Sequence, residues 1–374
     1  MPRVSVIIPS YNHEKYVAES LNSVFAQTYQ DFEIIITDDG SQDRTVEVIK
    51  QFNDPRIKLF CFSQNQGAVV AANHCIQNAQ GEFIALLNSD DVFKPQKLEV
   101  QVKFLDENSN IGAVFSQAQF IGENSQVLTI VNYENFDKEN RTRFEWLNYF
   151  FYHGNCLCHP SILIRKECYD NIGLYDPRLA QLPDFEFWIR LCQKYEIFVL
   201  PEKLVKFRIR DNEANASAYT TESRRRIYIE YPMVFQQYLN SSILDNLEKV
   251  FPEAIPKEWS KHYSNDFDIL GYYLIANLCL ESKISSINYL GINIMYDLLS
   301  DSNFMDHELI KQKLNYTDLI KISGNYEIFS DQNLNEEFKF FKSSKVYKIW
   351  IFLVKFKRVF LKIISRFKKQ LLGE

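Results

Sequence analysis

Two apolar runs near the start of the chain each lead directly into a pair of aspartates. The first is EIIITDD (33–39) and the second is FIALLNSDD (83–91). Continuous apolar runs are typical of parallel strands that are buried on both faces, whereas adjacent carboxylates require water or a cation. A fold that satisfies both demands must bury the strands and leave their carboxyl ends open.

Strand-like and helix-like segments alternate four times from the N-terminus. The strand-like segments are Val4–Ile8, Phe32–Thr37, Ile57–Phe62 and Phe83–Leu87, and the helix-like ones are 14–28, 41–52, 67–79 and 95–105. This alternation predicts an α/β domain with a mostly parallel sheet, and Ser41 is expected to cap the second helix. Open parallel sheets bind ligands at the carboxyl ends of their strands, so Asp38, Asp39, Asp90 and Asp91 should line one crevice.

The later part of the chain alternates less regularly. Strands are expected at 111–120 and 161–164 and helices at 141–152 and 184–195, and from about residue 220 the chain reads as helical. Hydrophobic residues make up 46% of the 374 residues, which is ample for a sizeable core. A chain of this length suggests two domains, or one large domain with an appendage.

The charge of the chain is unevenly distributed. The whole chain carries −6, which argues against a nucleic-acid-binding protein. Residues 342–374 hold ten of the 42 Lys and Arg and one of the 48 Asp and Glu, so this segment carries +9 and the remainder carries −15. Such asymmetry suggests a basic tail with a partner of its own.

Cysteine usage and hydropathy indicate a reducing compartment. The seven cysteines have no regular spacing, and Cys156-x-Cys158-His159 is at most half of a zinc site, so we expect reduced, mostly buried thiols. The first apolar run is too short for a signal peptide, and no stretch of about 18 charge-free apolar residues predicts a membrane span. We therefore expect a cytoplasmic protein, with any membrane contact peripheral on the inner face.

Several acids in one crevice require a cation. Mg²⁺ and Mn²⁺ bind carboxylate oxygens and commonly share their coordination with substrate phosphates, so NSDD (88–91) predicts a nucleotide-diphosphate ligand held through a divalent metal. The alternative is that the acids cap the loops and helices that follow them. Two acid pairs at strand ends within one α/β unit favour the ligand.

Four ordered blocks, VSVIIPSYN, DFEIIITDDGSQDRT, NQGAVVAANHCIQNAQGEFIALLNSDD and PDFEFWIRL, resemble the family 2 glycosyltransferases with the GT-A fold. The match covers roughly residues 3–217. The resemblance implies a Rossmann-like, nucleotide-sugar-binding domain over 1–217. It says nothing of a helical region at 218–342 or of the basic tail at 343–374.

The resemblance also implies the residues of the donor side. The positions that match the family's nucleotide-binding residues are Pro9, Tyr11, Asp39, Asn88 and Ser89. Asp90 matches the acid that binds Mn²⁺ or Mg²⁺, the ion that bridges the two phosphates. Asn88 stands where the family usually has its first acid, so one formal charge is lost and metal affinity is expected to be weaker.

The residues of the acceptor side follow from the same resemblance. Asp184 falls where the family places its catalytic base, beside an acceptor-binding region around His159. Its carboxylate would remove a proton from an acceptor hydroxyl that attacks the anomeric carbon, and one displacement inverts that carbon. Glu186 is the rival base, because the two acids point about 200° apart on a helix and only one can face the crevice. Structural roles are the alternative for His159, and Trp188 is expected to pack in the core.

Some positions depart from the family pattern. Pro183 precedes Asp184 where many relatives have Glu. Arg208 and Arg210 lie in the loop after the base, where either could hold diphosphate bidentately. The alternative is that both are surface charges on an edge strand. Asp91 is a further possible contact to acceptor or diphosphate.

Residues 343–372 form a basic amphipathic pattern. One helical stripe is apolar and the opposite one is basic: Ile349, Phe352, Leu353, Phe356, Phe360, Ile363, Ile364, Phe367 and Leu371 against Lys355, Arg358, Lys362, Arg366 and Lys369. A helix of this length extends about 45 Å. We expect it to lie on an anionic membrane surface. The alternatives are packing on the protein's own helices or on a second copy in a homodimer.

Together these features predict an inverting, metal-dependent glycosyltransferase that uses a nucleotide-diphosphate sugar, with UDP the expected nucleotide. Its acceptor would be a glycan or a lipid-linked molecule in cell-surface polysaccharide synthesis. One alternative is a sugar-nucleotide pyrophosphorylase, although PSYN (9–12) replaces the Gly-rich loop that such an enzyme needs. Another is a non-catalytic scaffold that keeps the fold, which Asn88 and Pro183 would allow.

Overall fold

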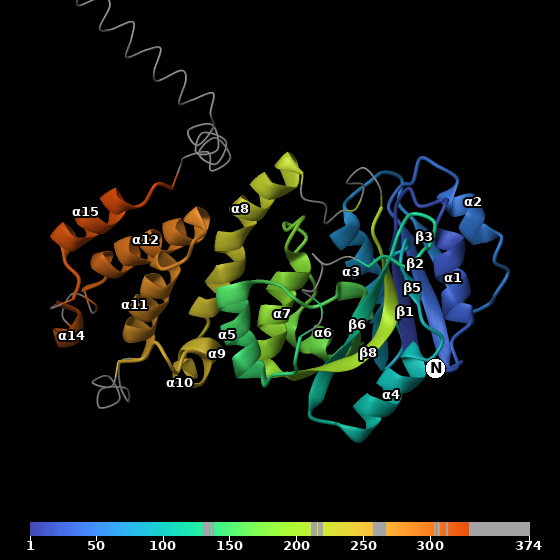
Figure 1. Cartoon of the computed structure of the whole chain (residues 1–374), viewed down its shortest axis with the longest axis horizontal. Helices are drawn as coiled ribbons and strands as arrows, with labels where there is room; N and C mark the ends of the chain where they lie inside the picture. Colours follow the sequence, from blue (N-terminus) through green and yellow to red (C-terminus); the bar gives the residue numbers. More distant parts are fainter. Residues whose placement is uncertain are drawn as a thin grey trace, which may run out of the picture. The chain divides into compact units, whose positions relative to one another are not determined.

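The computed structural model describes residues 1–129, 136, 138–210, 215, 220–256, 267–302, 304, 307–311 and 313–328. The chain divides into two compact units, Met1–Leu319 and Ile320–Glu374. The first unit holds the sheet and the helices that surround it (Figure 1). The tail predicted at 343–374 lies outside the described residues, and the expected domain boundary at residue 217 stays a prediction.

Eight strands of the described chain form one sheet, in the order β3-β2-β1-β4-β7-β6-β8-β5. The strands are β1 (Val4–Ser10), β2 (Phe32–Asp38), β3 (Ile57–Cys61), β4 (Phe83–Leu86), β5 (Val92–Phe93), β6 (Ile111–Ile121), β7 (Leu163–Arg165) and β8 (Glu196–Arg208). Strands β3, β2, β1 and β4 are parallel, as are β6 and β8. Strand β7 is antiparallel to β4 and β6, and β5 is antiparallel to β8. The expected α/β class with a mostly parallel sheet is confirmed.

Helices follow the strands as the alternation predicts. The helices of the sheet region are α1 (Val17–Phe25), α2 (Thr45–Lys50), α3 (Ala68–Asn78), α4 (Lys97–Glu107), α5 (Arg143–His153), η2 (His159–Ser161), α6 (Lys166–Ile172) and α7 (Pro183–Lys194). The expected cap at Ser41 is wrong, because α2 begins at Thr45 and has no side-chain cap. The Ser41 backbone N–H and hydroxyl instead donate to the Asp38 carboxylate, at 2.9 and 2.6 Å.

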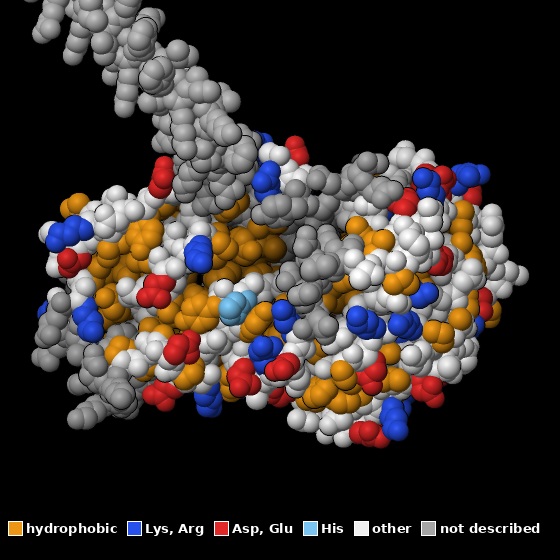
Figure 2. Space-filling model, in the orientation of Figure 1, with side chains coloured by type: hydrophobic (Ala, Val, Ile, Leu, Met, Phe, Trp, Pro, Cys, Tyr) orange, Lys and Arg blue, Asp and Glu red, His pale blue; other side chains and the backbone are white. Residues whose placement is uncertain are grey.

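The chain after residue 220 is helical, as expected. Its elements are α8 (Thr221–Phe235), η4 (Gln236–Leu239), α9 (Ser241–Leu244), α10 (Leu247–Val250), α11 (Phe267–Leu280), α12 (Ser285–Ser300), α14 (Glu308–Lys311) and α15 (Tyr316–Asn325). On the face drawn in Figure 2, hydrophobic side chains gather over α11 and α12. The exposed hydrophobic side chains of this region include Ile229, Tyr289 and Tyr296. None of the described helices is long and apolar enough to cross a membrane.

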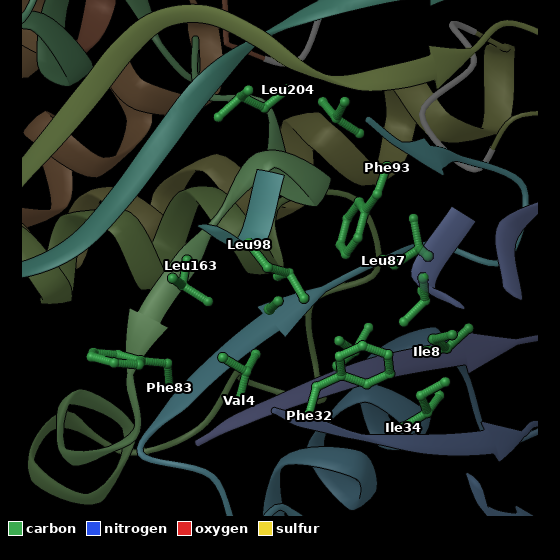
Figure 3. Packing of buried hydrophobic residues seen from close by; sticks show 14 of the residues in the cluster. Val4, Ile8, Phe32, Ile34, Phe83, Leu87, Phe93, Leu98, Leu163 and Leu204 are labelled. Atoms are coloured by element: carbon green, nitrogen blue, oxygen red, sulfur yellow. The ribbon is translucent and has the colours of Figure 1, made fainter. Parts of the chain in front are cut away.

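Apolar side chains cover the sheet and connect it to the helices. Val4 and Ile8 of β1 pack in one cluster with Phe32 of β2, Leu98 of α4 and Leu163 of β7 (Figure 3). Each of these side chains is at most 3% exposed. Full burial of one such side chain contributes about 1.5–3 kcal/mol, so the alternation of buried strands and amphipathic helices holds this part of the chain together.

A second, aromatic cluster joins the helical region to the sheet region. The ring of Phe151 on α5 lies 5.2 Å from Phe235, 4.9 Å from Tyr238 and 5.0 Å from Phe251. The buried hydroxyl of Tyr238 donates to the carbonyl of Leu147 at 2.7 Å. Aromatic pairs in this geometry stabilise beyond their buried area, so α8 and η4 are packed parts of the same compact unit as α5.

The turn after β2 depends on one glycine. Gly40 has a φ of +73°, and a Cβ added there would lie 2.7 Å from the backbone carbon of Gln64 and 2.8 Å from the backbone nitrogen of Asn65. Only glycine combines a left-handed φ with this close approach of two backbones. Gly40 therefore fixes the turn that carries Asp39 against the loop that leads into α3.

We predict that Gly40→Ala destabilises the protein more than Gly154→Ala does. Gly154 also has a positive φ, of +77°, but a Cβ there would meet nothing within 4 Å. Gly154→Ala should therefore lose only about 1–2 kcal/mol of stability, the cost of backbone strain at a positive φ. Gly40→Ala should lose more, because its Cβ also clashes with the neighbouring backbone. Urea unfolding of both variants measures the difference, and equal losses would show that the close approach is relaxed at little cost.

Candidate active site

The two acid pairs follow strands that end at the same edge of the sheet. Strand β1 pairs in parallel with both β2 and β4, and in this register Ser10 lies opposite Asp38. The backbone N–H of Asp39 donates to the carbonyl of Ser10 at 2.8 Å, and that of Leu87 donates to the carbonyl of Ile7 at 3.0 Å. The loops after β1, β2 and β4 therefore start side by side, which is where an open parallel sheet binds ligands.

The two aspartates after β2 have different surroundings. The buried carboxylate of Asp38 accepts both donors of Ser41, so Asp38 fits the alternative role of closing the loop. The buried carboxylate of Asp39 accepts the backbone N–H groups of Gln66 and Gly67, at 2.7 and 2.9 Å. A carboxylate has about four acceptor sites, so Asp39 keeps the capacity to accept from a ligand.

The loop after β1 offers further groups on the donor side. Pro9 is half-buried, and the side chain of Tyr11 is 40% exposed. The buried hydroxyl of Ser10 has no hydrogen-bond partner among the described residues. A buried hydroxyl without a partner is costly, so this orphaned group suits a site that a ligand completes.

Asp91 points into the protein. Its carboxylate accepts from the Asn88 side-chain amide at 3.0 Å and from the Arg208 backbone N–H at 2.8 Å. Burial raises the pKa of Asp91 well above its ordinary value, and the neighbouring charge of Asp90 raises this pKa further. Both oxygens have protein partners, so Asp91 holds the loop together and ties Asn88 in place.

His13 is a site residue that sequence reasoning missed, although it directly follows the PSYN turn. Its Nδ1 lies 2.7 Å from the Ser89 hydroxyl, and Arg210 Nη1 lies 2.9 Å from its Nε2. Arginine can only donate, so Nε2 accepts and Nδ1 carries the proton that is donated to Ser89. Burial lowers the pKa of His13, which agrees with this neutral tautomer.

Asp90 is the candidate metal ligand of the loop. Its side chain is 10% exposed, and its Oδ2 lies 3.3 Å from Arg210 Nε and 3.8 Å from His13 Nε2. No group of three or more His, Cys, Asp or Glu side chains that could hold a metal occurs among the described residues. The donor set fits a Mg²⁺ or Mn²⁺ ion that takes one carboxylate from the protein and further oxygens from a diphosphate.

Arg208 binds the loop after β4 through its guanidinium group. It ends β8 and is 1% exposed, so the alternative of a surface charge is wrong for this residue. Its Nε donates to the Asp90 carbonyl at 2.7 Å, its Nη2 to Glu19 at 2.6 Å, and its Nη1 to the Gly122 carbonyl and the Ser125 hydroxyl, both at 3.0 Å. Strand β8 lies between β6 and β5, so it is not an edge strand.

Asp184 lies at the start of α7 and is half-buried. Its Oδ1 accepts from the backbone N–H of Phe185 at 2.8 Å, and its Oδ2 accepts from the Asn155 side chain at 2.9 Å. The Asn155 oxygen in turn accepts from the backbone N–H of Leu157 at 3.1 Å. Asn155 orients the carboxylate, and sequence reasoning missed it because it lies in a loop with no motif of its own.

Glu186, the alternative base, is bound by the side chains of Arg190 and Gln237. It is buried, and its carboxylate accepts from Arg190 Nε at 2.6 Å, Arg190 Nη2 at 2.7 Å and the Gln237 side chain at 2.8 Å. Arg190 also donates to the carbonyls of Ile172 and Leu174, at 2.6 and 2.7 Å. An acid with this many partners holds helices and loops together.

His159 lies in an aromatic setting. Its Nε2 lies 2.9 Å from the Tyr175 hydroxyl, and its ring makes a T-shaped contact with the ring of Trp188, with the two centroids 5.6 Å apart. Burial lowers the pKa of His159, while the Asp184 charge opposes this shift. Trp188 is fully buried, as expected for a core residue. The contact of His159 with an acceptor stays a prediction.

The seven cysteines are free thiols, and six of them are buried. Burial raises the pKa of Cys75 and of Cys156 to about 12, so these thiols are poor nucleophiles and poor metal ligands. The expectation of reduced, mostly buried thiols agrees with their placement.

Comparison with protein families identifies the N-terminal part of the chain. The family model described as Glycosyl transferase family 2 matches residues 5–173. The chain is 33% identical to the uncharacterized glycosyltransferase MJ1057 of Methanocaldococcus jannaschii over 218 residues. This alignment covers 56% of this chain and 73% of MJ1057. The chain is 30% identical over 213 residues to the putative glycosyltransferase EpsE of Bacillus subtilis, covering 55% of this chain and 73% of EpsE.

Other similar proteins share shorter segments or the fold alone. The putative teichuronic acid biosynthesis glycosyltransferase TuaG of Bacillus subtilis is 43% identical over 110 residues, 29% of this chain and 44% of TuaG. Residues 1–349 of S. aureus TarS, in complex with UDP-GlcNAc, superpose with a TM-score of 0.54 at 20% identity, covering 84% of this chain and 93% of that one. Against a longer TarS chain the match covers 54% of its length. The predicted GT-A fold is confirmed.

Proposed function

The chain belongs to glycosyl transferase family 2, and on that premise we propose that it is an inverting transferase that uses a nucleotide-diphosphate sugar, with UDP as the nucleotide. The observation that carries the proposal is the common edge at which the loops after β1, β2 and β4 start, with Asp39 on one loop and Asp90 on another. The name of TuaG, which assigns that protein to teichuronic acid biosynthesis, supports a role in cell-surface polysaccharide synthesis.

The donor nucleotide would bind at the loops after β1 and β2. Asp39 is held by two backbone amides and keeps acceptor capacity for an N–H of the base. Tyr11 and Pro9 would line the base and the ribose, and Asn88 and Ser89 would approach the ribose from the loop after β4. The TarS fragment that shares this fold was solved with UDP-GlcNAc, which supports UDP as the nucleotide.

The diphosphate would lie beside Asp90, which is the residue that would hold Mn²⁺ or Mg²⁺. Such an ion, when bound, neutralises charge on the leaving diphosphate. Arg210 Nε lies 3.3 Å from Asp90 Oδ2. Of the two arginines, Arg210 is therefore the one that would contact the diphosphate directly. Arg208 would act indirectly, because its guanidinium is committed to the protein.

Asp184 would serve as the general base. The acceptor hydroxyl oxygen forms a bond to the anomeric carbon as the bond from that carbon to the diphosphate oxygen breaks. The electron pair leaves with the diphosphate, and the acceptor proton passes to Asp184. Asn155 keeps the carboxylate oriented for this transfer, and the region of His159 would contact the acceptor.

A glycan or lipid-linked acceptor would bring the protein to the inner face of the cell membrane. The basic tail supports this location through its charge and its amphipathic pattern, and hydrophobic side chains gather over α11 and α12 in Figure 2. We propose peripheral attachment to an anionic surface through residues 343–372. A homodimer formed through the same segment is the competing arrangement.

The donor side is tested with UDP. Asp39→Asn should weaken UDP binding with or without Mn²⁺, because the amide of asparagine replaces one acceptor oxygen. Asp90→Ala should remove only the part of the affinity that Mn²⁺ adds. Isothermal titration of both variants measures this, with Glu248→Gln as an exposed control. If both variants bind UDP and Mn²⁺ like the wild type, the donor site lies elsewhere.

The two acids of α7 should separate catalysis from stability. Asp184→Asn should keep UDP binding and lose transfer by at least about a hundredfold, the scale of a missing general base. Glu186→Gln keeps an oxygen that can accept from Gln237, so it should lower the rate per folded molecule much less than Asp184→Asn does. It should cost about 3–5 kcal/mol of stability, because it removes the charge of one partner of a buried pair. UDP release and thermal unfolding report the two effects, and the reverse pattern would make Glu186 the base.

The tail is tested by co-sedimentation with liposomes. The full chain should bind anionic vesicles and release them as salt rises, because each basic residue contributes about 1 kcal/mol near an anionic surface and salt screens this attraction. A chain ending at Ser343 should stay in the supernatant and still bind UDP. If both chains sediment equally, or if the full chain shows no preference for anionic lipid, the alternatives are favoured: the helix packs on the protein's own helices or on a second copy.

A further inference from the structure

A single glutamate of α8 binds the segment that leads into α7. The carboxylate of Glu230 accepts from the backbone N–H of Ala180 at 2.8 Å, of Gln181 at 2.9 and 3.2 Å, and of Leu182 at 2.8 Å. Glu230 is 5% exposed. Three consecutive amides thus converge on one buried carboxylate that lies about 50 positions later in the chain.

This arrangement satisfies groups that would otherwise be costly. Leu182 is buried, and a buried backbone N–H without an acceptor costs about 1–3 kcal/mol. The buried carboxylate of Glu230 would cost far more without donors. Among the described residues, the hydrogen bonds to the Glu230 carboxylate come from these three amides. Its negative charge also lies at the N-terminus of α7, where the helix dipole is favourable.

The bound segment ends two positions before the proposed base. Leu182 is the N-cap of α7, Pro183 is its first residue and Asp184 its second. Pro183 restricts the backbone at this junction. A shift of residues 180–182 would therefore also move Asp184. A second contact supports the same turn, because the Gln237 side chain donates to Glu186 at 2.8 Å.

We propose that Glu230 is a positioning residue for the transfer reaction, acting through the backbone of residues 180–182 on the carboxylate of Asp184. The inference rests on the proposed role of Asp184 as the base. It assigns to the helical region a part in catalysis, since α8 lies outside the segment that the family model matches.

The effect should appear in kcat and leave the donor KM unchanged. Glutamine at position 230 would keep one acceptor oxygen and turn an NH₂ group toward amides that need an acceptor. Misplacing a reacting group by about 1 Å can cost about a hundredfold in rate. We therefore expect Glu230→Gln to lower kcat between about tenfold and a hundredfold, with the KM for the donor and the affinity for UDP within about twofold of the wild type.

The experiment combines kinetics with hydrogen exchange. UDP release is measured from a panel of UDP-sugars that begins with UDP-N-acetylglucosamine, for Glu230→Gln, Glu230→Asp, Asp184→Asn and the double variant Asp184→Asn with Glu230→Gln. Glu248→Gln is the matched control, because it removes an exposed charge from the same region. Thermal unfolding confirms that each variant is folded, and exchange of the amides of residues 180–182 reports the contact itself.

The outcomes distinguish the inference from the proposed function. If Glu230 acts through Asp184, the double variant is no slower than Asp184→Asn alone, Glu230→Asp recovers part of kcat, and the amides of 180–182 exchange faster in Glu230→Gln. Losses that multiply in the double variant, or a wild-type kcat in Glu230→Gln, overturn the inference. If the wild type turns over no donor in the panel, the proposed function fails, and unchanged exchange at 180–182 would independently overturn the contact.

Discussion

The parallel pairing of β1 with β2 and β4 is the constraint on which the rest of the structure depends. These strands are buried on both faces, so their backbones must be fully paired, and the two acid pairs lie at their carboxyl ends. Because the strands are parallel, all three ends lie at one edge. The loops that carry Asp39 and Asp90 are therefore neighbours in space, although about 50 positions separate them in the chain.

Charges buried at this edge need partners from the protein, and the partners come from distant segments. Arg208 connects the carbonyl of Asp90, the carboxylate of Glu19 and the turn at Gly122. A guanidinium at 1% exposure would be strongly destabilising without such bonds. Its planar set of five donors can satisfy several acceptors at once, which explains why an arginine holds two loops and helix α1 together at one point.

The sequence predicted what local patterns encode. Apolar runs marked β1 and β2, and the acid-rich motif marked Asp39 and Asp90, because burial and strand ends leave a pattern along the chain. Contacts between distant positions leave none. His13 and Arg210 are 197 positions apart. For Arg208 the sequence left a diphosphate contact and a surface charge both open, because nothing near it in the sequence shows that it is buried. Ser41 looked like a helix cap, but its donors are satisfied by Asp38.

The dependence of α7 on Glu230 and Gln237 sets an order of events during synthesis. The residues of the donor edge are complete once residue 210 has emerged from the ribosome, and domains begin to fold N-terminal first, at about 5–20 residues per second of synthesis. The turn that carries Asp184 is held from a helix and a 3₁₀ turn that emerge later. A nascent chain would therefore form the proposed nucleotide half of its site before Asp184, the acid proposed to act on the other substrate, is in place.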